Sequence, residues 1–494
     1  MRRESAAVRS VLVLLIGCLP WGHLSAQGSG APLTMQGLDH GMSQTAAARA
    51  AGGTVFAWSE DPGMMFLNPA GLASLTGIRF SSGLRRQFSV LAQEQHYAPL
   101  KYYSNFSLLM EGLTGLVPDP DTSLPGVTAG DTVQRPFDDI GPHWSRSRHG
   151  NRPVQAALAV PFSLGSTQWA AGLGVTEYAD MDHYYQNNNV LTPPILSERP
   201  LPTPRPPNDS LPVVADWSQF AQARAGSLRG YGAALAGRLT DELSAGVSGM
   251  IVRGSTDDEE LRTGRGRLTF FTSFFRLDSV YRHSSRRGTS DYSGAEFTFS
   301  ALYRGPHLML GLAVTPPATI TRKWSAVEET DTTGMPLRTV AQGEDRMRIP
   351  WRGRAGAALT PSERLTMAVE YELRSYESAV YTGMDGSETR PWLSASVVHA
   401  GIEFRALDWL TLRAGMRNQS EVFEPEGNAL AGDPVSASVY SAGTGFAWEG
   451  FRLNLAYEYA VVRYEDVWGS AISRNTDKRH GIAADIVYEI PDLW

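Results

Sequence analysis

Residues 363–376 read ERLTMAVEYELRSY, and their alternation decides the fold class. Apolar residues occupy every second position from Leu365 to Leu373, while Glu370 and Glu372 are among the residues between them. Because successive side chains of a strand point to opposite faces, this stretch predicts a strand with one apolar and one charged face. Residues 451–462, FRLNLAYEYAVV, repeat the pattern. A soluble sandwich buries the apolar face, whereas a membrane barrel turns it to lipid and lines its lumen with the charged face.

The lengths of the connections separate these two folds. Short hairpin connections are expected at 163–167, 240–242, 304–307, 360–362, 407–408 and 449–450, and long polar or Pro-rich segments at 179–227, 254–293, 316–345, 375–394 and 420–437. Outer-membrane barrels alternate short periplasmic turns with long outer loops in this way, whereas a soluble sandwich has no reason to do so. The sequence therefore predicts an all-β protein, a transmembrane antiparallel β-barrel.

The strand count follows from the hairpins. Six hairpins give twelve strands between Pro153 and Arg463, and one further strand at each end gives about fourteen. Sixteen strands is the alternative, because residues 78–110 have room for three strands instead of one. An even number is expected in either case.

The last strand has a pattern that concerns assembly. Its apolar residues share a face with the terminal aromatic residue; they are Ile486, Tyr488, Ile490 and Trp494. This resembles the aromatic-ended signal that the barrel-assembly machinery reads, although Pro491 and Asp492 interrupt it. Barrel-assembly machinery and outer-membrane lipid are therefore expected partners.

The first residues indicate export. Three arginines precede an apolar run over residues 11–21, and the small residues Ser25 and Ala26 follow it, so residues 1–26 are predicted to be a signal peptide. Cys18, the single cysteine, also lies in a box that resembles a lipoprotein cleavage site. The chain of 494 residues has a formal charge of -7, and the mature part is more acidic still, which argues against nucleic acid as a partner. The predicted location is the cell outer membrane of a Gram-negative-type bacterium.

A second kind of structure is expected only near the N-terminus. Residues 46–51 are good helix formers ended by Gly52 and Gly53, and the pairs Asp61-Pro62 and Asn68-Pro69 each place a capping side chain before a helix-starting proline. A barrel of fourteen strands encloses more space than its own side chains fill. We therefore expect residues 27–76 to fold into the lumen as a hatch, and residues 77–494 to form the barrel.

The hatch also carries a resemblance. An Ala-rich helix, Gly-Gly and an Asp-containing turn are followed by FLNPAGLA at residues 66–73. This order resembles the N-terminal hatch of the FadL-type outer-membrane transport family, to which TodX-like channels belong, and PorV-like proteins of the type IX secretion system have a similar hatch. The hatch motif comprises Asn68, Pro69, Ala70, Gly71 and Leu72. The Pro-rich segment 187–212 does not resemble the helical outer loops of that family.

What the resemblance implies is an outer-membrane channel for passive uptake of hydrophobic small molecules such as long-chain fatty acids. The alternative is a PorV-like barrel that transports nothing and docks protein partners in secretion. For the channel, the candidate ligand-binding residues are the apolar residues of the hatch: Phe56, Trp58, Met64, Met65 and Phe66. Flexible Met and flat aromatic side chains suit alkyl chains of variable shape, but the same residues suit packing of the hatch against the wall.

Other candidate sites have simpler explanations. A solvated loop is expected to contain Asp180, Asp182 and His183, although these residues resemble the acids and histidines of barrel hydrolases. The acidic run at residues 257–260 could hold a divalent cation or form a charged loop tip. A hydrophobic landing patch or a strand pair would explain Phe270, Phe271, Phe274 and Phe275. Glu370, Glu372, Arg374, Arg452 and Glu458 are expected to form a polar network in the lumen. No phosphate loop, nucleophile elbow or zinc-spaced His pair is present, so we expect neither an enzyme nor a cofactor or metal.

Overall fold

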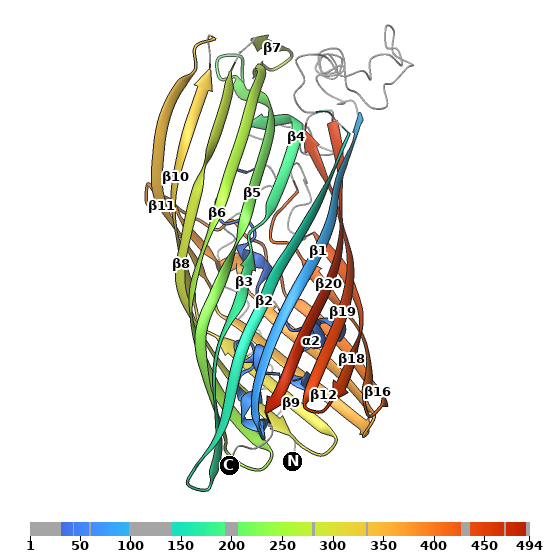
Figure 1. Ribbon diagram of the computed structural model, residues 1–494. Helices are drawn as coiled ribbons and strands as arrows, with labels where there is room; N and C mark the ends of the chain where they lie inside the picture. Colours follow the sequence, from blue (N-terminus) through green and yellow to red (C-terminus); the bar gives the residue numbers. More distant parts are fainter. Residues whose placement is uncertain are drawn as a thin grey trace, which may run out of the picture.

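The computed structural model describes residues 31–42, 44–58, 61–97, 141, 143–192, 206–278, 282–331, 334–425, 435–468 and 471–490. These residues form one closed antiparallel barrel with a small helical segment inside it (Figure 1). The predicted signal peptide and Trp494 lie outside the described residues.

Fourteen strands make the barrel wall, as predicted. They are β1 (Ile78–Tyr97), β2 (Trp144–Leu164), β3 (Thr167–Asp180), β5 (Val213–Arg238), β6 (Leu243–Phe270), β8 (His283–Arg304), β9 (Leu308–Thr315), β12 (Arg352–Ser362), β13 (Leu365–Arg374), β16 (Val397–Leu407), β17 (Leu410–Ser420), β18 (Ser436–Trp448), β19 (Phe451–Trp468) and β20 (Ala471–Ile490). The register of β1 against β20, from Ile78–Ile490 to Tyr97–Ala471, closes the wall. The sixteen-strand alternative is wrong, because residues 78–97 form the single strand β1.

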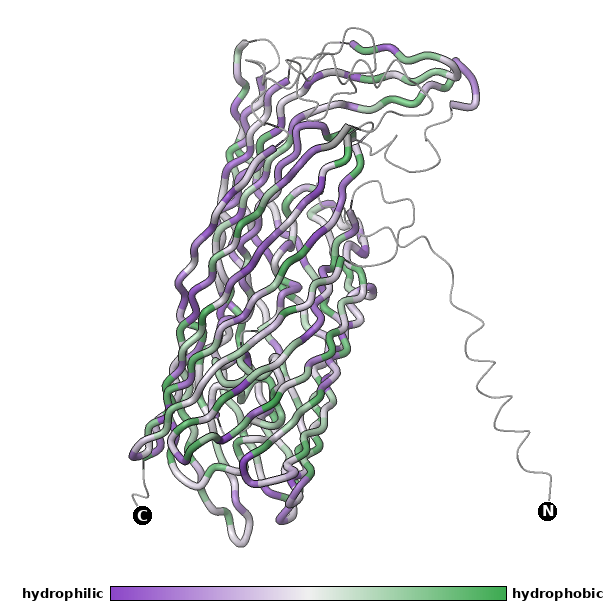
Figure 2. Tube along the Cα trace, turned by 90° about the vertical axis from the view of Figure 1, so that its right-hand side faces the viewer, coloured by the Kyte–Doolittle hydropathy of each residue, from purple (hydrophilic) through white to green (hydrophobic). Residues whose placement is uncertain are grey.

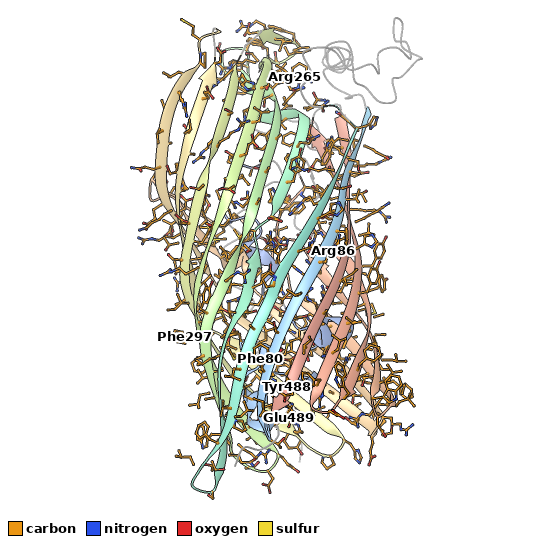
Figure 3. The ribbon with its side chains drawn as sticks, viewed as in Figure 1. Phe80, Arg86, Arg265, Phe297, Tyr488 and Glu489 are labelled. Carbon is orange, nitrogen blue, oxygen red and sulfur yellow. The ribbon has the colours of Figure 1, made fainter. Side chains whose placement is uncertain are left out.

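The exposed side of the wall is apolar and the lumen side is polar. On β13, Val369 is 59% exposed while the neighbouring Glu370 is 1% exposed. Hydrophobic segments are concentrated in the lower half of the wall in Figure 2, and Figure 3 shows Phe80 and Phe297 in that half. Stacked aromatic pairs such as Trp448–Phe451 and Phe451–Tyr488 lie near the short turns. This is the pattern of a transmembrane barrel with an aromatic girdle, which confirms that interpretation of the alternation.

The upper half of the molecule differs from the expectation. The segments expected as long outer loops are mostly strands that extend the wall or lean against it: β4 (His183–Thr192), β7 (Phe275–Asp278), β10 (Ala318–Asp331), β11 (Leu337–Ile349), β14 (Val380–Thr382) and β15 (Glu388–Thr389), with the short helix η6 (Tyr376–Ser378). Residues 257–260 accordingly lie within β6 and not at a loop tip. Charged residues stand on both faces of β10 and β11, where Arg322 and Asp345 are buried while Lys323 and Arg346 are exposed, so alternation of apolar and polar residues does not reveal these strands.

The hatch occupies the lumen, where its blue ribbon is visible in Figure 1. Its elements are η1 (Leu38–His40), α2 (Ala46–Ala50), η2 (Phe56–Trp58), η3 (Pro62–Met64) and η4 (Pro69–Ser74). Thr45 caps α2 by accepting a hydrogen bond from the Ala48 amide, and Gly52 and Gly53 follow with φ of 71° and 83°. The two short helices after Asp61 and Asn68 are confirmed, while η1 and η2 were not expected. No helix among the described residues is long and apolar enough to cross a membrane.

Candidate functional site

Charged side chains of the wall hold the hatch in the lumen. Glu370 accepts hydrogen bonds from the Val55 and Phe56 amides at 2.7 and 2.8 Å. Arg354 donates to the Gly53 carbonyl at 3.0 Å, and Arg49 of α2 lies 2.6 Å from Glu458. These partners satisfy buried charges that would otherwise cost several kcal/mol each. Glu370 and Glu458 of the predicted polar network thus bind the hatch. Of its other members, Glu372 pairs with Arg374 at 2.6 Å, whereas Arg452 is exposed.

Small residues in the wall allow the hatch to approach closely. A Cβ at Gly311 of β9 would lie 2.1 Å from Cγ of Phe56, and one at Gly246 of β6 would lie 2.6 Å from the Ala70 amide. Gly415 of β17 faces Gly52 at a similar separation. Because Cβ atoms do not occur at such distances, these wall positions require glycine wherever the hatch is docked.

Four of the predicted ligand-binding residues are buried where the hatch packs. Phe56 packs with Ala70 and two wall residues, Met64 packs within the hatch, and Met65 and Phe66 belong to the main apolar cluster. The side chain of Trp58 lies outside the description. None of the four lines either of the two cavities described below. Their packing role is observed, and a contact with ligand stays a prediction.

One predicted contact of the hatch motif is absent from the structure. Asn68 precedes η4, but its side chain makes no capping hydrogen bond, so the predicted cap is wrong. Ala70 is bound instead: its amide donates to Ser300 Oγ at 2.8 Å, and its carbonyl accepts from Ser244 Oγ at 3.1 Å. Both serines belong to the wall, so η4 is fixed by wall side chains acting on its backbone.

Above the hatch lies a cavity of about 140 Å³, which we name the outer cavity. Apolar and aromatic side chains from the outer wall and connections dominate it: Leu91, Tyr184, Tyr185, Pro391, Trp392, Val422, Phe423, Val462 and Tyr464. The η1 residues Asp39 and His40 also line it, so it borders the hatch directly. Sequence reasoning missed this cavity because Trp392 and Phe423 stand in connections without alternation; large apolar residues within polar connections were the available signal.

A second cavity, of about 190 Å³, lies within the lumen and is polar. We name it the lumen cavity. Its lining includes six arginines: Arg49, Arg85, Arg148, Arg374, Arg417 and Arg479. An apolar ligand that entered it would displace water from these charges without replacing their hydrogen bonds, which is unfavourable. The outer cavity is therefore the better site for a hydrophobic molecule.

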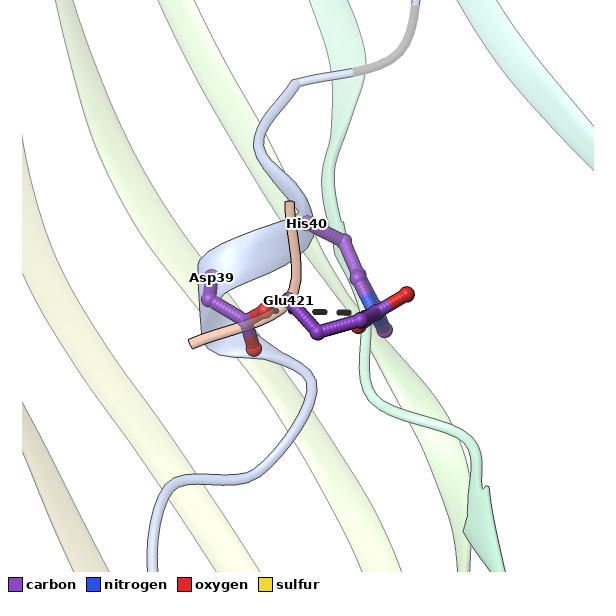
Figure 4. A group of neighbouring side chains, drawn as sticks. All are labelled: Asp39, His40 and Glu421. Carbon is purple, nitrogen blue, oxygen red and sulfur yellow. Dashed lines mark ion pairs between the residues drawn. The ribbon is translucent and has the colours of Figure 1, made fainter. Parts of the chain in front are cut away.

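His40 is the ionic contact between η1 and the connection that follows β17. Its Nε2 lies 3.6 Å from Glu421 and 3.9 Å from Asp39. Figure 4 shows the three side chains gathered together, with their ion pairs dashed. Burial disfavours the charged imidazole, but Asp39 and Glu421 outweigh it and raise the pKa of His40 to about 9. The three ligand atoms are close enough together for a metal ion, yet Arg479 already forms an ion pair with Glu421 at 2.9 Å. A metal ion would have to replace the proton of His40 and compete with Arg479 for Glu421. These residues therefore fit ion pairing and not metal binding.

Asp180 and Asp182, predicted to lie in a solvated loop, are half-buried side chains in ion pairs at the end of β3. The strand β3 pairs with β2 only as far as Thr176 opposite Gln155, and beyond that point side chains bridge the two strands. Arg152 lies 2.7 Å from each of Asp180 and Asp182, and Arg148 lies 2.8 Å from Asp182. Because arginines of β2 bind both carboxylates, Asp180 and Asp182 have a structural role: they link the end of β3 to β2.

The fold is shared with solved channels. A FadL homologue of Pseudomonas aeruginosa matches with a TM-score of 0.57 at 15% identity, over 91% of this chain and 99% of that chain. The toluene transporter TodX of Pseudomonas putida matches with a TM-score of 0.52 at 14% identity, over 93% and 100%. This chain has the FadL-type fold. The CymD monoaromatic hydrocarbon channel, with a TM-score of 0.51 at 11% identity over 91% and 98%, shares the FadL-type fold too. No protein-family model and no curated protein sequence matches the chain.

Proposed function

We propose that this protein is an outer-membrane channel for the passive uptake of hydrophobic small molecules in a Gram-negative-type bacterium. The observation that carries the proposal is the outer cavity, which borders the hatch and in which nine apolar and aromatic side chains gather at one place of the lumen. An apolar ligand gains roughly 0.8 kcal/mol for each methylene that it buries there. Two solved channels of the same fold, a monoaromatic hydrocarbon channel and a toluene transporter, support this class of ligand.

The charges around the outer cavity favour an uncharged ligand. Its lining carries the carboxylates of Asp39, Asp182, Glu421 and Asp477, against the cations Arg148, Arg479 and protonated His40. A fatty-acid carboxylate entering this cavity meets no excess of positive charge and loses its own hydration. We therefore propose uncharged hydrocarbons ahead of the long-chain fatty acids that the resemblance implies.

The docked hatch keeps the lumen from conducting solutes freely. It binds the wall on several sides through Glu370, Arg354 and Ser300, so a ligand cannot pass straight through the lumen while the hatch is docked. Passage requires local rearrangement of the hatch or of the wall. No catalytic role is proposed for the protein.

Equilibrium binding to the purified barrel in detergent tests the proposal. Labelled alkane or aromatic hydrocarbon and a labelled long-chain fatty acid are titrated against native protein and the variants Trp392→Ala and Phe423→Ala. We expect hydrocarbon to bind and each variant to weaken this binding at least tenfold, because each loses roughly 1.5–3 kcal/mol of apolar contact and about 1.4 kcal/mol is a factor of ten. Trp409→Ala, an exposed aromatic residue near the short turns, is the matched control and should bind normally. Absence of hydrocarbon binding, together with a stably co-purified protein partner, would favour the PorV-like alternative.

A further inference from the structure

Two arginines face each other on the exposed side of the wall. Arg229 of β5 is directly opposite Arg253 of β6 in the antiparallel register. Their neighbours Leu228 and Val252 are fully buried toward the lumen, so alternation directs both arginines outward. Directly opposite residues have Cβ atoms about 5 Å apart, and like charges in that arrangement destabilise a sheet.

Nearby carboxylates do not neutralise this arginine pair. Glu177 is opposite Arg229 on the other side of β5, but its carboxylate is 3.0 Å from Arg85. Asp291 is diagonal to Arg253 across β8. Among the residues that the structure describes, no side-chain hydrogen bond or ion pair involves Arg229 or Arg253. The pair therefore lacks a counter-ion within the described protein.

The arginine pair sits at the edge of the lipid-facing surface. The next outward pair toward the short turns is Tyr231 opposite Ile251, with exposures of 50% and 55%. The next outward pair in the other direction is Ser227 opposite Ser255. Elsewhere in the wall Arg86, labelled in Figure 3 well above Phe80, has its guanidinium 4.6 Å from the Phe88 ring. Arg229 and Arg253 thus follow the apolar pair Tyr231–Ile251 on the outward face, in the direction away from the short turns.

We propose that Arg229 and Arg253 form a binding site for a phosphate group of an anionic membrane lipid. Guanidinium groups on two directly opposite residues can both donate N–H groups to the oxygens of one phosphate. The exposed pair Tyr231–Ile251 below them suits the acyl chains of the same molecule. In an outer membrane the upper boundary meets the outer leaflet, so the ligand class is a phosphorylated lipopolysaccharide anchor.

The test uses purified full-length protein in detergent, titrated with bis-phosphorylated lipid A and followed by native mass spectrometry. We expect the double variant Arg229→Gln, Arg253→Gln to retain lipid A at least tenfold less well than native protein. The charge-matched control is Arg276→Gln with Arg338→Gln, two exposed arginines on β7 and β11. Heat-modifiable migration on gels verifies that each variant is folded; if the double variant is not, each single variant is tested instead.

Each further outcome bears on a separate part of the proposal. Lipid A without phosphates should bind native protein weakly, no better than bis-phosphorylated lipid A binds the double variant. Inorganic phosphate at the same concentration should not displace bis-phosphorylated lipid A from native protein. Equal retention of bis-phosphorylated lipid A by native protein and the double variant would show that Arg229 and Arg253 do not bind the lipid phosphate. An equal loss in the control double variant would reduce the effect to general charge, and full displacement by inorganic phosphate would overturn the assignment to lipid.

Discussion

Nε2 of His40 in the hatch lies 3.6 Å from Oε2 of Glu421, which follows β17 at the outer side of the lumen. The same carboxylate is 2.9 Å from Arg479 of β20. One ion cluster therefore ties the first turn of the hatch to the wall and to the connection that lines the outer cavity. Burial of Glu421 opposes its ionisation, but Arg479 and His40 prevail and hold the pKa of that carboxyl well below its usual range.

The first prediction concerns pH. The pKa of His40 is raised from 6.5 to about 9, so its stabilising contact is complete below pH 6.5 and is lost as pH rises through about 9. The lowered pKa of Glu421 places its loss only at strongly acid pH. We expect single-channel conductance in planar bilayers to rise between about pH 8 and pH 10, as the hatch loosens.

His40→Gln is the informative variant for that measurement. It should show the raised conductance already at pH 7, with little further change on titration, at a cost of about 1 kcal/mol in hatch docking. His480→Gln changes a histidine that contacts Tyr457 instead and serves as control. An unchanged alkaline rise in His40→Gln would show that another group titrates.

A second prediction fixes the sidedness of the barrel. Residues 206–212 lie directly before β5 at the end of the barrel remote from the short turns, and Asn208 is exposed. An epitope tag after Asn208 should be labelled by antibody on intact cells. The same tag after Asp241, in the short β5–β6 turn, should be labelled only after the outer membrane is permeabilised. The reverse result would invert the topology.

The sequence predicted the lower barrel well because lipid and lumen impose opposite chemistry on alternate residues. Val369 and Glu370 are adjacent in sequence and differ almost completely in exposure. Above the apolar surface this constraint ends, because water contacts the outer face and polar partners line the inner one. Strands such as β10 and β11 were therefore expected as loops, although their pairing is regular over thirteen residue pairs.

The candidate site was less predictable, because it depends on contacts between residues far apart in the chain. The apolar hatch residues were found from sequence, but whether Met65 meets a ligand or the wall depends on Gly172 and Gly174 of β3, which leave room for it. The outer cavity combines residues from the hatch, β1, β4 and the connections after β15 and β17. Neither periodicity nor a local motif brings such residues together.

A third prediction tests the docking of the hatch through Phe56. Gly311→Ala would place a Cβ 2.1 Å from the Phe56 ring, so we expect a lower free energy of unfolding in urea titrations of the barrel in detergent. Phe56→Ala alone should cost about 3–5 kcal/mol through lost packing. Combining the two substitutions should cost less than their sum, because they share one space. Gly353→Ala, whose new Cβ would meet its nearest atom at 3.9 Å, is the control. Strict additivity would show that Phe56 does not rest on Gly311.

The last prediction concerns the hatch as a plug. Deleting residues 41–67 removes α2, η2 and η3, and with them the contacts to Glu370, Arg354 and Glu458. The wall closes through β1 and β20 without these residues, so the barrel should still insert and migrate normally on gels. Its conductance for small polar solutes should rise well above that of native protein, since the exposed lumen is charged and wet. Glu370→Gln, which keeps the hatch but weakens two of its hydrogen bonds, should give an intermediate conductance. If the deleted protein inserts normally with unchanged conductance, the hatch does not seal the lumen, and docking of a protein partner becomes the better account of this segment.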